Sequence, residues 1–476
     1  MNILFAASEL SPYLKTGGLG DVMASLPQAL RDRGHSISIT LPLYTALRSH
    51  LPSLTPSKVY LRVPFNGTIL PGRVWIGTTH HGLRIFALER DEFFDRSQPY
   101  GTADGDYFDN ASRFGWFSRA LIELLPYIDP TPEILHLNDW QTGPAALWAR
   151  QLRRRPQTIF TIHNLAYQGV FPPDAVAPTG LLDHGFTPEG HEFYGRVNFL
   201  KAGLVFSDRI TTVSPSYATA IQTPAFGCGL DGLLRTRAHH LTGILNGIDT
   251  ATWDPSTNPL LAQTYSPQDL SGKTACKHDL LAACGWTDRP HAPIFGSVSR
   301  LVASKGFDLI LAASPHLRQH GARLVILGTG EPRLEEAFRD LARRFPDDIV
   351  ARIEFSETWA HRIEAGSDFF LMPSEMEPCG LNQMYSQRYG TPPIVHQAGG
   401  LADSVEPWNP KTATGTGFAF KPFQTGAFLT EIDRALSLYQ KPKQLAQLRK
   451  NAMTRDFSWN ARVPDYEALY SSLLIG

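Results

Sequence analysis

The chain has 476 residues, of which 42% are hydrophobic and 19% charged, a balance typical of globular proteins and unlike that of disordered chains. Its 44 Lys and Arg residues nearly cancel its 45 Asp and Glu residues, so the formal net charge is −1 and nucleic-acid binding through bulk charge is not expected. Any anionic ligand must therefore be met by local groups of charged residues.

The N-terminal segment, the apolar runs and the cysteines indicate the cellular compartment of the protein. No basic segment precedes the first apolar run, so Ile3–Ala6 is predicted to be a strand and not part of a signal peptide. No run approaches the ~18 apolar residues of a membrane span. Cys228, Cys276, Cys284 and Cys379 lack metal-like spacing, so disulfides and structural zinc are not expected. We expect a soluble, cytoplasmic protein without a membrane partner.

Short β-rich runs alternate with helical stretches, which is typical of parallel sheets with crossover helices. The first series of predicted strands is Ile3–Ala6, Ser36–Leu41, Ile134–Leu137, Thr158–Ile162 and Ile210–Val213. The second series is Ile294–Val298, Arg323–Leu327, Arg352–Phe355, Phe369–Met372 and Pro393–Val395. The pattern predicts an α/β protein with two similar halves.

A loop-like segment, residues 246–273, separates the two series and is rich in Pro, Ser, Thr and Asn. We therefore predict an N-terminal domain over 1–245 and a C-terminal domain over 246–455. The remaining residues, 456–476, form a closing segment. Its apolar side chains recur at three- and four-residue intervals, which predicts an amphipathic helix, at Tyr466, Leu469, Tyr470 and Leu473.

One glycine phrase occurs near both ends of the chain, as Gly17-Gly18-Leu19-Gly20-Asp21 and as Gly399-Gly400-Leu401-Ala402-Asp403. Each copy follows a predicted strand and precedes a helical pattern. Such a turn presents backbone N–H groups and the positive end of a helix dipole to an anion. The spacing matches neither a phosphate-binding Walker loop nor a dehydrogenase fingerprint. Two copies favour two similar domains that face a cleft and close on a phosphate-bearing ligand.

Two cations follow the predicted strand Ile294–Val298, namely Arg300 and Lys305. The loops after the carboxyl ends of parallel strands line the ligand crevice of an open sheet. An arginine and a lysine at that edge are suited to a diphosphate, and the alternative is that they are ordinary surface cations. Lys15, before the first glycine turn, is a third cation of this kind.

Glu377 follows the predicted strand Phe369–Met372 and precedes Pro378, which restricts it to extended geometry. Gly380 allows the backbone to approach a ligand closely. A carboxylate held beside two cations is suited to binding sugar hydroxyls or to stabilising a developing positive charge.

Two further strand ends carry polar residues. His163 and Asn164 follow Thr158–Ile162, and Asp139 and Trp140 follow Ile134–Leu137. An acid beside an aromatic ring is common in sugar sites, whereas a histidine at a strand end is as often structural as catalytic.

Taken in order along the chain, these motifs resemble those of bacterial glycogen synthase and plant starch synthase. The resemblance runs nearly end to end. The segments that carry it are Lys15–Val22, Phe226–Leu234, Asn246–Asp249, Arg300 with Lys305-Gly306, Glu377–Leu381, Ala398–Asp403 and Phe457–Trp459.

The resemblance implies a GT-B architecture, in which two Rossmann-like domains with parallel sheets face a deep cleft and the final helix packs back on the N-terminal domain. It implies a retaining glucosyltransferase that moves glucose from ADP-glucose to the non-reducing 4-hydroxyl of an α-1,4-glucan such as glycogen. Neither a metal nor any other cofactor is implied.

The resemblance also implies roles for individual residues. Those expected to take part in catalysis are Glu377, Arg300, Lys305, His163 and Asp139. Those expected to bind the donor are Lys15, Gly17, Gly18, Asp21, Asn164, Asn246, Cys379, Gly380, Leu381, Gly399 and Gly400. Gly399 and Gly400 would offer backbone N–H groups. Tyr100 and Trp140 are expected to contact the acceptor.

The chain departs from the family pattern at a few positions, and alternatives stay open. Asn138 and Gln141 stand where relatives commonly carry histidines, and Met376 stands where an aromatic residue is usual. The donor could be UDP-glucose, and the acceptor a lipid or a small sugar. A catalytically silent nucleotide-binding regulator is a further alternative. The sequence leaves oligomeric state and allosteric control open.

Overall fold

The computed structural model describes residues 1–102 and 105–474, and the chain divides into two compact units. Unit 1 comprises Met1–Gly247 and Trp459–Gly476, and unit 2 comprises Ile248–Ser458. The predicted boundaries after 245 and 455 lie two and three residues before these limits. The predicted closing segment ends with residues 475–476, which lie outside the described residues. Among the helices that are described, none is both long and apolar enough to cross a membrane.

Unit 1 is built on a nine-stranded sheet in which seven parallel strands are followed by an antiparallel hairpin. Its strands, in spatial order, are β14 (Leu241–Gly243), β13 (Arg209–Thr212), β9 (Gln157–Ile162), β8 (Ile134–Asn138), β1 (Asn2–Ala6), β2 (Ser36–Pro42), β5 (Arg84–Glu89), β4 (Thr68–Thr78) and β3 (Thr55–Phe65). Small antiparallel ribbons are formed by β6 (Gly101–Thr102) with β7 (Gly105–Asp106), and by β10 (Val170–Phe171), β12 (Arg196–Asn198) and β11 (Glu192–Phe193).

The helices of unit 1 include one that comes from the far end of the chain. They are α1 (Gly18–Asp32), α2 (Thr45–His50), α3 (Asp91–Phe94), α4 (Asn110–Leu124), α5 (Pro144–Arg150), α6 (Pro173–Val176), α7 (Phe199–Phe206), α8 (Pro215–Ala220), α9 (Asp231–Thr236) and α18 (Val463–Leu474). The apolar residues of α18 belong to the same buried cluster as Ile3 and Phe5 of β1. All four residues on which the closing helix was predicted are buried there, namely Tyr466, Leu469, Tyr470 and Leu473.

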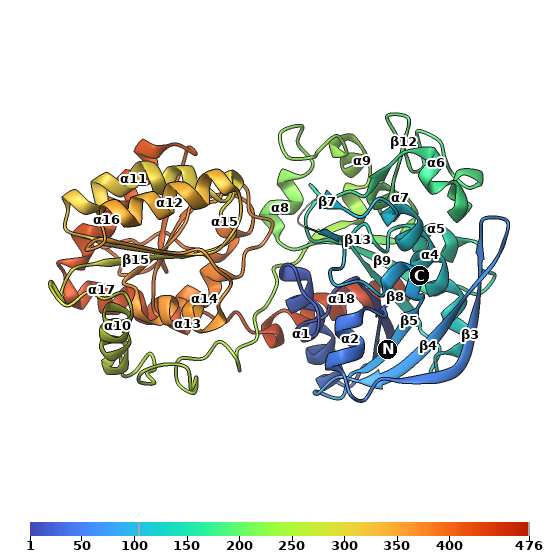
Figure 1. Cartoon of the computed structure of the whole chain (residues 1–476), viewed down its shortest axis with the longest axis horizontal. Helices are drawn as coiled ribbons and strands as arrows, with labels where there is room; N and C mark the ends of the chain where they lie inside the picture. Colours follow the sequence, from blue (N-terminus) through green and yellow to red (C-terminus); the bar gives the residue numbers. More distant parts are fainter. Residues whose placement is uncertain (103–104, 475–476) are drawn as a thin grey trace. The chain divides into compact units, whose positions relative to one another are not determined.

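Unit 2 is built on a six-stranded, entirely parallel sheet. Its strands, in spatial order, are β17 (Ile349–Arg352), β16 (Arg323–Leu327), β15 (Ile294–Val298), β18 (Phe369–Met372), β19 (Pro393–His396) and β20 (Phe418–Phe420). Its helices are α10 (Ser271–Ala283), α11 (Phe307–Gln319), α12 (Pro332–Arg344), α13 (Glu357–Gly366), α14 (Asn382–Arg388), α15 (Gly400–Ser404), α16 (Thr425–Tyr439) and α17 (Pro442–Thr454). In Figure 1, α11 and α12 cover one face of this sheet, and α13 and α14 cover the other.

Both sheets share one strand order. In unit 2 the parallel strands, numbered along the chain, run 3-2-1-4-5-6, and those of unit 1 run 7-6-5-4-1-2-3 before the hairpin. The first strand therefore lies beside the fourth, β1 beside β8 and β15 beside β18. This is the dinucleotide-binding order, whose ligand crevice lies outside the carboxyl ends of the first and fourth strands. The predicted α/β class with parallel sheets is confirmed.

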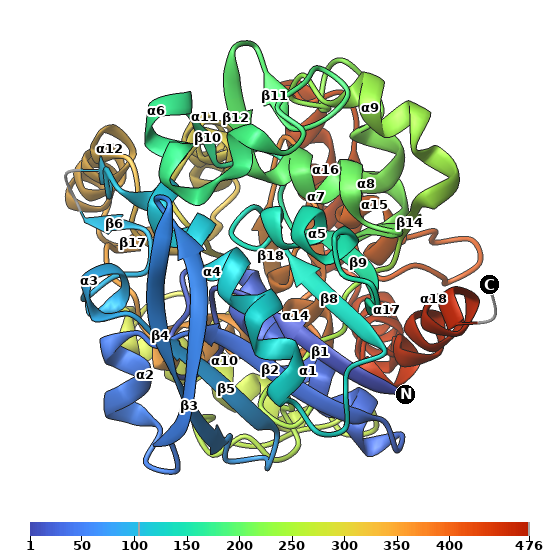
Figure 2. The same cartoon turned by 90° about the vertical axis from the view of Figure 1, so that its right-hand side faces the viewer.

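Several strands differ from the sequence analysis, among them β17, the β3–β4 hairpin and β5, and the short strands β14 and β20 were also not predicted. The strand predicted over 352–355 is wrong, because β17 ends at Arg352 and its buried Ile349 pairs with Leu324. Phe355 is 86% exposed instead of forming part of the sheet. The strands β3, β4 and β5, which lie side by side in Figure 2, were not predicted. The polar and glycine residues of β3 and β4 interrupt the apolar alternation because much of this hairpin faces solvent. The strand β5 is instead a short buried apolar run that the sequence analysis did not identify.

Candidate functional site

The first glycine turn connects β1 to α1 and carries two of the predicted donor residues as an ion pair. Gly17 precedes the first turn of α1, and a Cβ atom added to it would meet nothing within 4 Å, so a ligand can approach this backbone. Lys15 Nζ donates to both carboxylate oxygens of Asp21, at 2.8 and 3.1 Å. Both side chains are at least partly exposed, and the carboxylate holds the ammonium group at the N-terminus of the helix.

Glu9, which the sequence analysis did not identify, stabilises this turn through hydrogen bonds to its backbone. Its buried carboxylate accepts hydrogen bonds from the N–H groups of Thr16, at 2.8 Å, and Gly17, at 3.3 Å. It also accepts one from the Tyr100 hydroxyl at 2.7 Å. Burial, and next the Glu9 charge, raise the pKa of Tyr100 well above its usual value. Tyr100 and the glycine turn are therefore fixed by one buried acid.

Asp139 lies directly after β8 in the left-handed backbone region, with φ +56°. This conformation is uncommon for a residue other than glycine and is concentrated at functional sites. The carboxylate accepts the His163 backbone N–H at 2.7 Å, which ties it to the end of the neighbouring strand β9. The pKa of Asp139 is raised to about 7, mainly by burial and also by the nearby Glu9 charge, against the lowering effect of hydrogen bonds from the backbone N–H groups of His163 and Asn164.

The His163 imidazole is neutral and its tautomer is set by Asn138. The Asn138 amide donates to the carbonyl oxygens of Ala6, at 3.1 Å, and His136, at 3.3 Å, so its own oxygen faces the ring. His163 Nε2 therefore donates to Asn138 Oδ1 at 2.9 Å, and Nδ1 is left as an acceptor. Burial lowers the pKa of His163 to about 3. This histidine can accept a hydroxyl proton in a hydrogen bond, but it is a weak base.

An aromatic group accompanies Asp139. Trp140 lies 6.4 Å from Tyr100 and 5.0 Å from Phe114 between ring centroids. The two predicted acceptor residues, Tyr100 and Trp140, thus belong to one cluster in unit 1.

Two asparagines of unit 1 are among the predicted donor residues. The Asn164 side chain accepts the Ala166 N–H at 3.0 Å and shapes the turn after β9. Asn246 is buried, and its Oδ1 has no hydrogen-bond partner among the described residues. A buried, unpaired acceptor is costly unless a ligand or water satisfies it.

In unit 2 the predicted cations and carboxylate follow the carboxyl ends of β15 and β18, and two of them form an ion pair. Arg300 is exposed just beyond β15, and Lys305 ends the short helical turn Ala303–Lys305. Lys305 Nζ lies 2.5 Å from Glu377 Oε2, which also accepts the Ser374 hydroxyl at 3.1 Å. Glu377 is 7% exposed. An ion pair between a buried carboxylate and a lysine fixes both groups in direction.

The second glycine turn packs tightly against the Glu377 loop. A Cβ atom at Gly399 would lie 2.0 Å from Glu377 O, and one at Gly400 would lie 2.3 Å from Cys379 O. The Gly400 N–H donates to Glu377 O at 2.9 Å, so this N–H is not offered to a ligand and the glycine provides close packing instead. The prediction of a free backbone N–H therefore stays with Gly399. The helix that follows, α15, has only five residues, so its dipole is weak.

A buried glutamine supports the remaining donor residues. Gly380 has φ +74°, and Leu381 precedes α14. Gln383, fully buried, donates to the carbonyl oxygens of Cys379 and Gly380, each at 3.0 Å. The sequence analysis missed Gln383, and also Phe355, whose exposed ring follows β17 at the same edge of the sheet. The sequence carries one indication that Phe355 is exposed: this large apolar residue stands between two polar residues, Glu354 and Ser356.

The structure thus assembles the predicted residues into two groups, one in each unit. The group of unit 1 consists of Lys15, Gly17, Gly18, Asp21, Tyr100, Asp139, Trp140, His163, Asn164 and Asn246. The group of unit 2 consists of Arg300, Lys305, Glu377, Cys379, Gly380, Leu381, Gly399 and Gly400. Each group follows mainly the first and fourth parallel strands of its sheet, where α/β sheets bind ligands.

Comparison with known proteins gives consistent matches. Residues 2–236 match the family described as starch synthase catalytic domain, and residues 287–455 match glycosyl transferases group 1. The chain is 47% identical to a glycogen synthase of Myxococcus xanthus and 44% identical to one of Opitutus terrae, with 100% of each chain covered. A glycogen synthase of an Anaeromyxobacter species is 47% identical, with 99% of each chain covered.

Solved structures agree with these relatives. The chain is similar to the catalytic domain of starch synthase IV from Arabidopsis thaliana bound to ADP and acarbose, with a TM-score of 0.91 and 33% identity, over 100% of this chain and 99% of that one. A sucrose-phosphate synthase from Thermosynechococcus elongatus has a TM-score of 0.63 at 16% identity and shares the fold.

Proposed function

This chain belongs to the family of glycogen and starch synthases, which are GT-B glycosyltransferases that use a nucleotide sugar and a glucan, and we propose from that premise that its donor is ADP-glucose. Glucose is transferred to the non-reducing 4-hydroxyl of an α-1,4-glucan with retention of configuration, which elongates glycogen.

The observation that carries the proposal is the pairing of Lys305 with buried Glu377 at the carboxyl ends of the first and fourth strands of unit 2, the edge of the sheet at which Arg300 also follows its strand. Breaking the bond from the anomeric carbon to the diphosphate places negative charge on the phosphate and positive charge on the sugar. Fixed cations stabilise this transition state more than the ground state. Arg300 and Lys305 neutralise the leaving diphosphate, and Glu377 holds Lys305 and binds glucose hydroxyls.

The choice of nucleotide is supported by two observations. The similar starch synthase IV was solved with ADP. Phe355 exposes a flat apolar ring just beyond the carboxyl end of β17, and a purine offers such a ring a larger stacking surface than a pyrimidine does. Phe355→Ala is expected to raise KM for ADP-glucose roughly tenfold with little change in kcat, since stacking on a base contributes about 1–3 kcal/mol. An unchanged KM, measured from initial rates, would place the base elsewhere.

Unit 1 supplies the groups for the sugar. The neutral His163 ring presents Nδ1 as an acceptor for a glucose hydroxyl, and the unpaired Asn246 Oδ1 accepts another. Lys15, steadied by Asp21, adds a cation for the diphosphate together with the Gly17 turn. Tyr100 and Trp140 offer aromatic surface to the glucan.

Two groups are candidates to accept the proton of the attacking hydroxyl. In our preferred mechanism, the departing phosphate oxygen accepts this proton on the same face of the sugar. A nucleoside diphosphate is a good leaving group and needs no separate acid. Asp139 is the second candidate, because its pKa of about 7 suits a general base near neutral pH. His163, with a pKa of about 3, does not suit that role.

The proposal assigns the diphosphate charge to side chains and not to a metal ion. Activity is therefore expected to persist after dialysis against EDTA. Loss of turnover in EDTA with recovery on adding Mg²⁺ would reject this part of the proposal.

The deciding experiment is incubation of the protein with radiolabelled ADP-glucose or UDP-glucose and a glycogen primer. Label is expected to enter the polymer faster from ADP-glucose, and an α-1,4-specific glucosidase is expected to release it. Equal rates from both donors would reject the choice of ADP-glucose. Calorimetric ADP binding without any transfer would instead support a silent regulator.

A further inference from the structure

Two histidines and an aspartate lie together on unit 2, away from the loops at the carboxyl edge of its sheet. His316 lies in α11 and His320 directly follows that helix, and Asp433 lies in the neighbouring helix α16. One ligand atom from each lies within 4.8 Å of the other two. Of the residues that the structure describes, these are the only three His, Cys, Asp or Glu side chains found so arranged.

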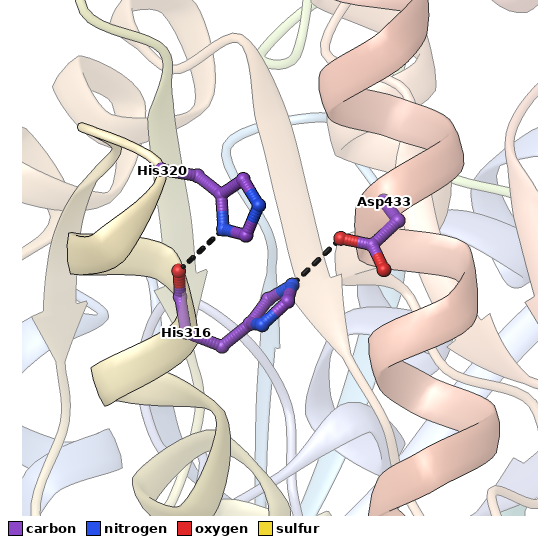
Figure 3. Close-up of side chains that lie close together, drawn as sticks. All are labelled: His316, His320 and Asp433. Atoms are coloured by element: carbon purple, nitrogen blue, oxygen red, sulfur yellow. Dashed lines mark hydrogen bonds and ion pairs between the residues drawn. The ribbon is translucent and has the colours of Figure 1, made fainter.

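The side chains already point toward one another. Figure 3 shows the His316 ring reaching toward Asp433, with the His320 ring nearby, just beyond the end of α11. His316 Nε2 and Asp433 Oδ1 are 2.6 Å apart, and the centroids of the two imidazole rings are 4.3 Å apart. The four-residue spacing places both rings on one face of the helix.

The tautomer of His320 is fixed in the form that binds a metal. His320 Nδ1 lies 2.9 Å from the carbonyl oxygen of His316, and a carbonyl only accepts, so Nδ1 carries the proton. The lone pair is therefore on Nε2. A metal-bound histidine usually donates its other ring N–H to a carboxylate or a backbone carbonyl in this way.

We propose that His316, His320 and Asp433 bind one divalent transition-metal ion, Zn²⁺ being the probe of choice. Two imidazole nitrogens and one carboxylate oxygen suit Zn²⁺ better than Mg²⁺ or Ca²⁺, which prefer oxygen ligands. Water completes the coordination, because the site is on the surface. On binding, the proton between His316 and Asp433 moves to the other ring nitrogen or leaves, and the metal takes its place.

The geometry needs only small side-chain movements to accept the ion. With metal–ligand bonds of about 2.1 Å, ligand atoms in a tetrahedral site are roughly 3.4 Å apart. The 2.6 Å contact must widen slightly, and His320 must move inward. Asp433 and His320 are exposed, and His316 is partly exposed, so these rotations displace no packed side chain.

A bound metal ion would link α11 to α16, two helices that share one hydrophobic core. Ile310, Ala313 and Leu317 of α11 lie in the same buried cluster as Phe428, Ile432 and Ala435 of α16. A ligand that binds only the folded state stabilises it. The metal is thus expected to raise the thermal stability of unit 2, and turnover without metal is expected to be unaffected, since none of these residues belongs to the catalytic groups.

The competing explanation is that the histidines serve only as cations at the C-terminal end of α11, with His316 paired to Asp433. Both explanations predict an effect of these residues on stability. Only the metal site predicts that the effect depends on Zn²⁺.

The test uses the full-length protein, stripped with EDTA and titrated with ZnCl₂ in a calorimeter, with thermal unfolding measured in parallel. The wild type is expected to bind one Zn²⁺ at this site and to gain about 5 °C in Tm at a hundredfold excess over Kd. His316→Gln with His320→Gln is expected to abolish this binding step, and Asp433→Asn to weaken it, because one of the three protein ligands loses its charge.

The matched control removes two other exposed histidines of unit 2, His278→Gln with His291→Gln, and is expected to bind Zn²⁺ as the wild type does. Co²⁺ substitution adds a readout, because its visible spectrum reports coordination by these ligands. Equal Zn²⁺ affinity and Tm gain in the wild type and the His316/His320 variant would overturn the proposal, and so would equal losses in the control variant.

Discussion

Arg300 is the residue whose charge the proposed chemistry needs most directly. It is exposed just beyond the end of β15, and Lys305, a few residues later, is paired to Glu377. Arg300→Ala is expected to lower kcat/KM by about 10²- to 10³-fold, the scale for losing one preorganised donor to a developing anion. Arg300→Lys restores the charge without the bidentate fork and should recover only part of the activity.

The control for Arg300 is Arg343→Ala, since Arg343 is an exposed arginine at the C-terminal end of α12. It should turn over at the wild-type rate. Near-normal kcat/KM for Arg300→Ala in the same assay would remove Arg300 from the proposed machinery.

Asp139 provides a pH-dependent prediction. Its pKa in the folded protein is about 7 and lies above its ordinary value of 3.8. If its carboxylate serves as base, Asp139→Asn should lower kcat/KM by about 10²- to 10⁴-fold and abolish the acid limb of the pH profile near 7. An acid limb that survives in the variant would assign the titration to another group and the proton to the leaving phosphate.

The same pKa makes a prediction about stability. Between about pH 4 and 7 the folded protein binds more protons at Asp139 than the unfolded chain does, so the contribution of this group to the free energy of unfolding falls as pH rises through that window. Asp139→Asn should therefore lose less stability than the wild type between pH 5 and pH 8. Urea denaturation at the two values measures the difference, and parallel losses in both proteins would contradict the raised pKa.

At the scale of elements, the close packing of the second glycine turn on the Glu377 loop is the feature with the sharpest consequence. A methyl group at Gly400 would lie 2.4 Å from Cys379 Cα, and the two segments share a backbone hydrogen bond. Gly400→Ala is expected to displace the loop that orients Glu377 and to lower kcat by about 10²-fold or more, as small misplacements in an active site do.

Gly426 supplies the comparison for Gly400, because a Cβ atom there meets nothing within 4 Å. It lies in the first turn of α16, and Gly426→Ala should leave activity unchanged and stability equal or slightly higher. Wild-type kcat in Gly400→Ala would mean that the loop tolerates displacement.

At the scale of the whole molecule, the return of the chain's last helix to unit 1 makes the stability of that unit depend on residues far away in sequence. Leu473 is 6% exposed and belongs to the core built on β1, whereas the adjacent Leu474 is 40% exposed. Leu473→Ala should destabilise the protein by about 2 kcal/mol, which corresponds to a fall in Tm of about 4–8 °C. Leu474→Ala should change Tm by less than about 2 °C. Calorimetry measures both, and equal shifts would contradict the packing of α18.

Much of the fold was predictable because its signals are local. Buried parallel strands are continuous apolar runs, so β15, β16 and β18 begin and end at the predicted residues. The β3–β4 hairpin was missed because its strands are partly exposed and less regular. The strand predicted at 352–355 was misplaced because Phe355 is apolar but faces solvent.

Some residues of the candidate site could be predicted from the sequence and others could not. Charged residues directly after strands, such as Arg300 and Glu377, could be predicted because parallel strands bring their carboxyl ends to one edge. Glu9, Asn138 and Gln383 could not, since their roles consist of hydrogen bonds to loops that the chain brings near only in three dimensions.

By itself, the sequence determined the alternation of strands and helices, the two glycine turns, the family and the charged residues that follow the strands, because these are properties of short segments. Only the tertiary structure decided that Glu377 is buried against Lys305, that Asn138 sets the tautomer of His163, and that Asp433 lies beside His316, 117 residues earlier in the chain. The physical reason is that burial, pKa and hydrogen-bond partners depend on which distant segments surround a side chain, and local patterns along the chain do not carry that information.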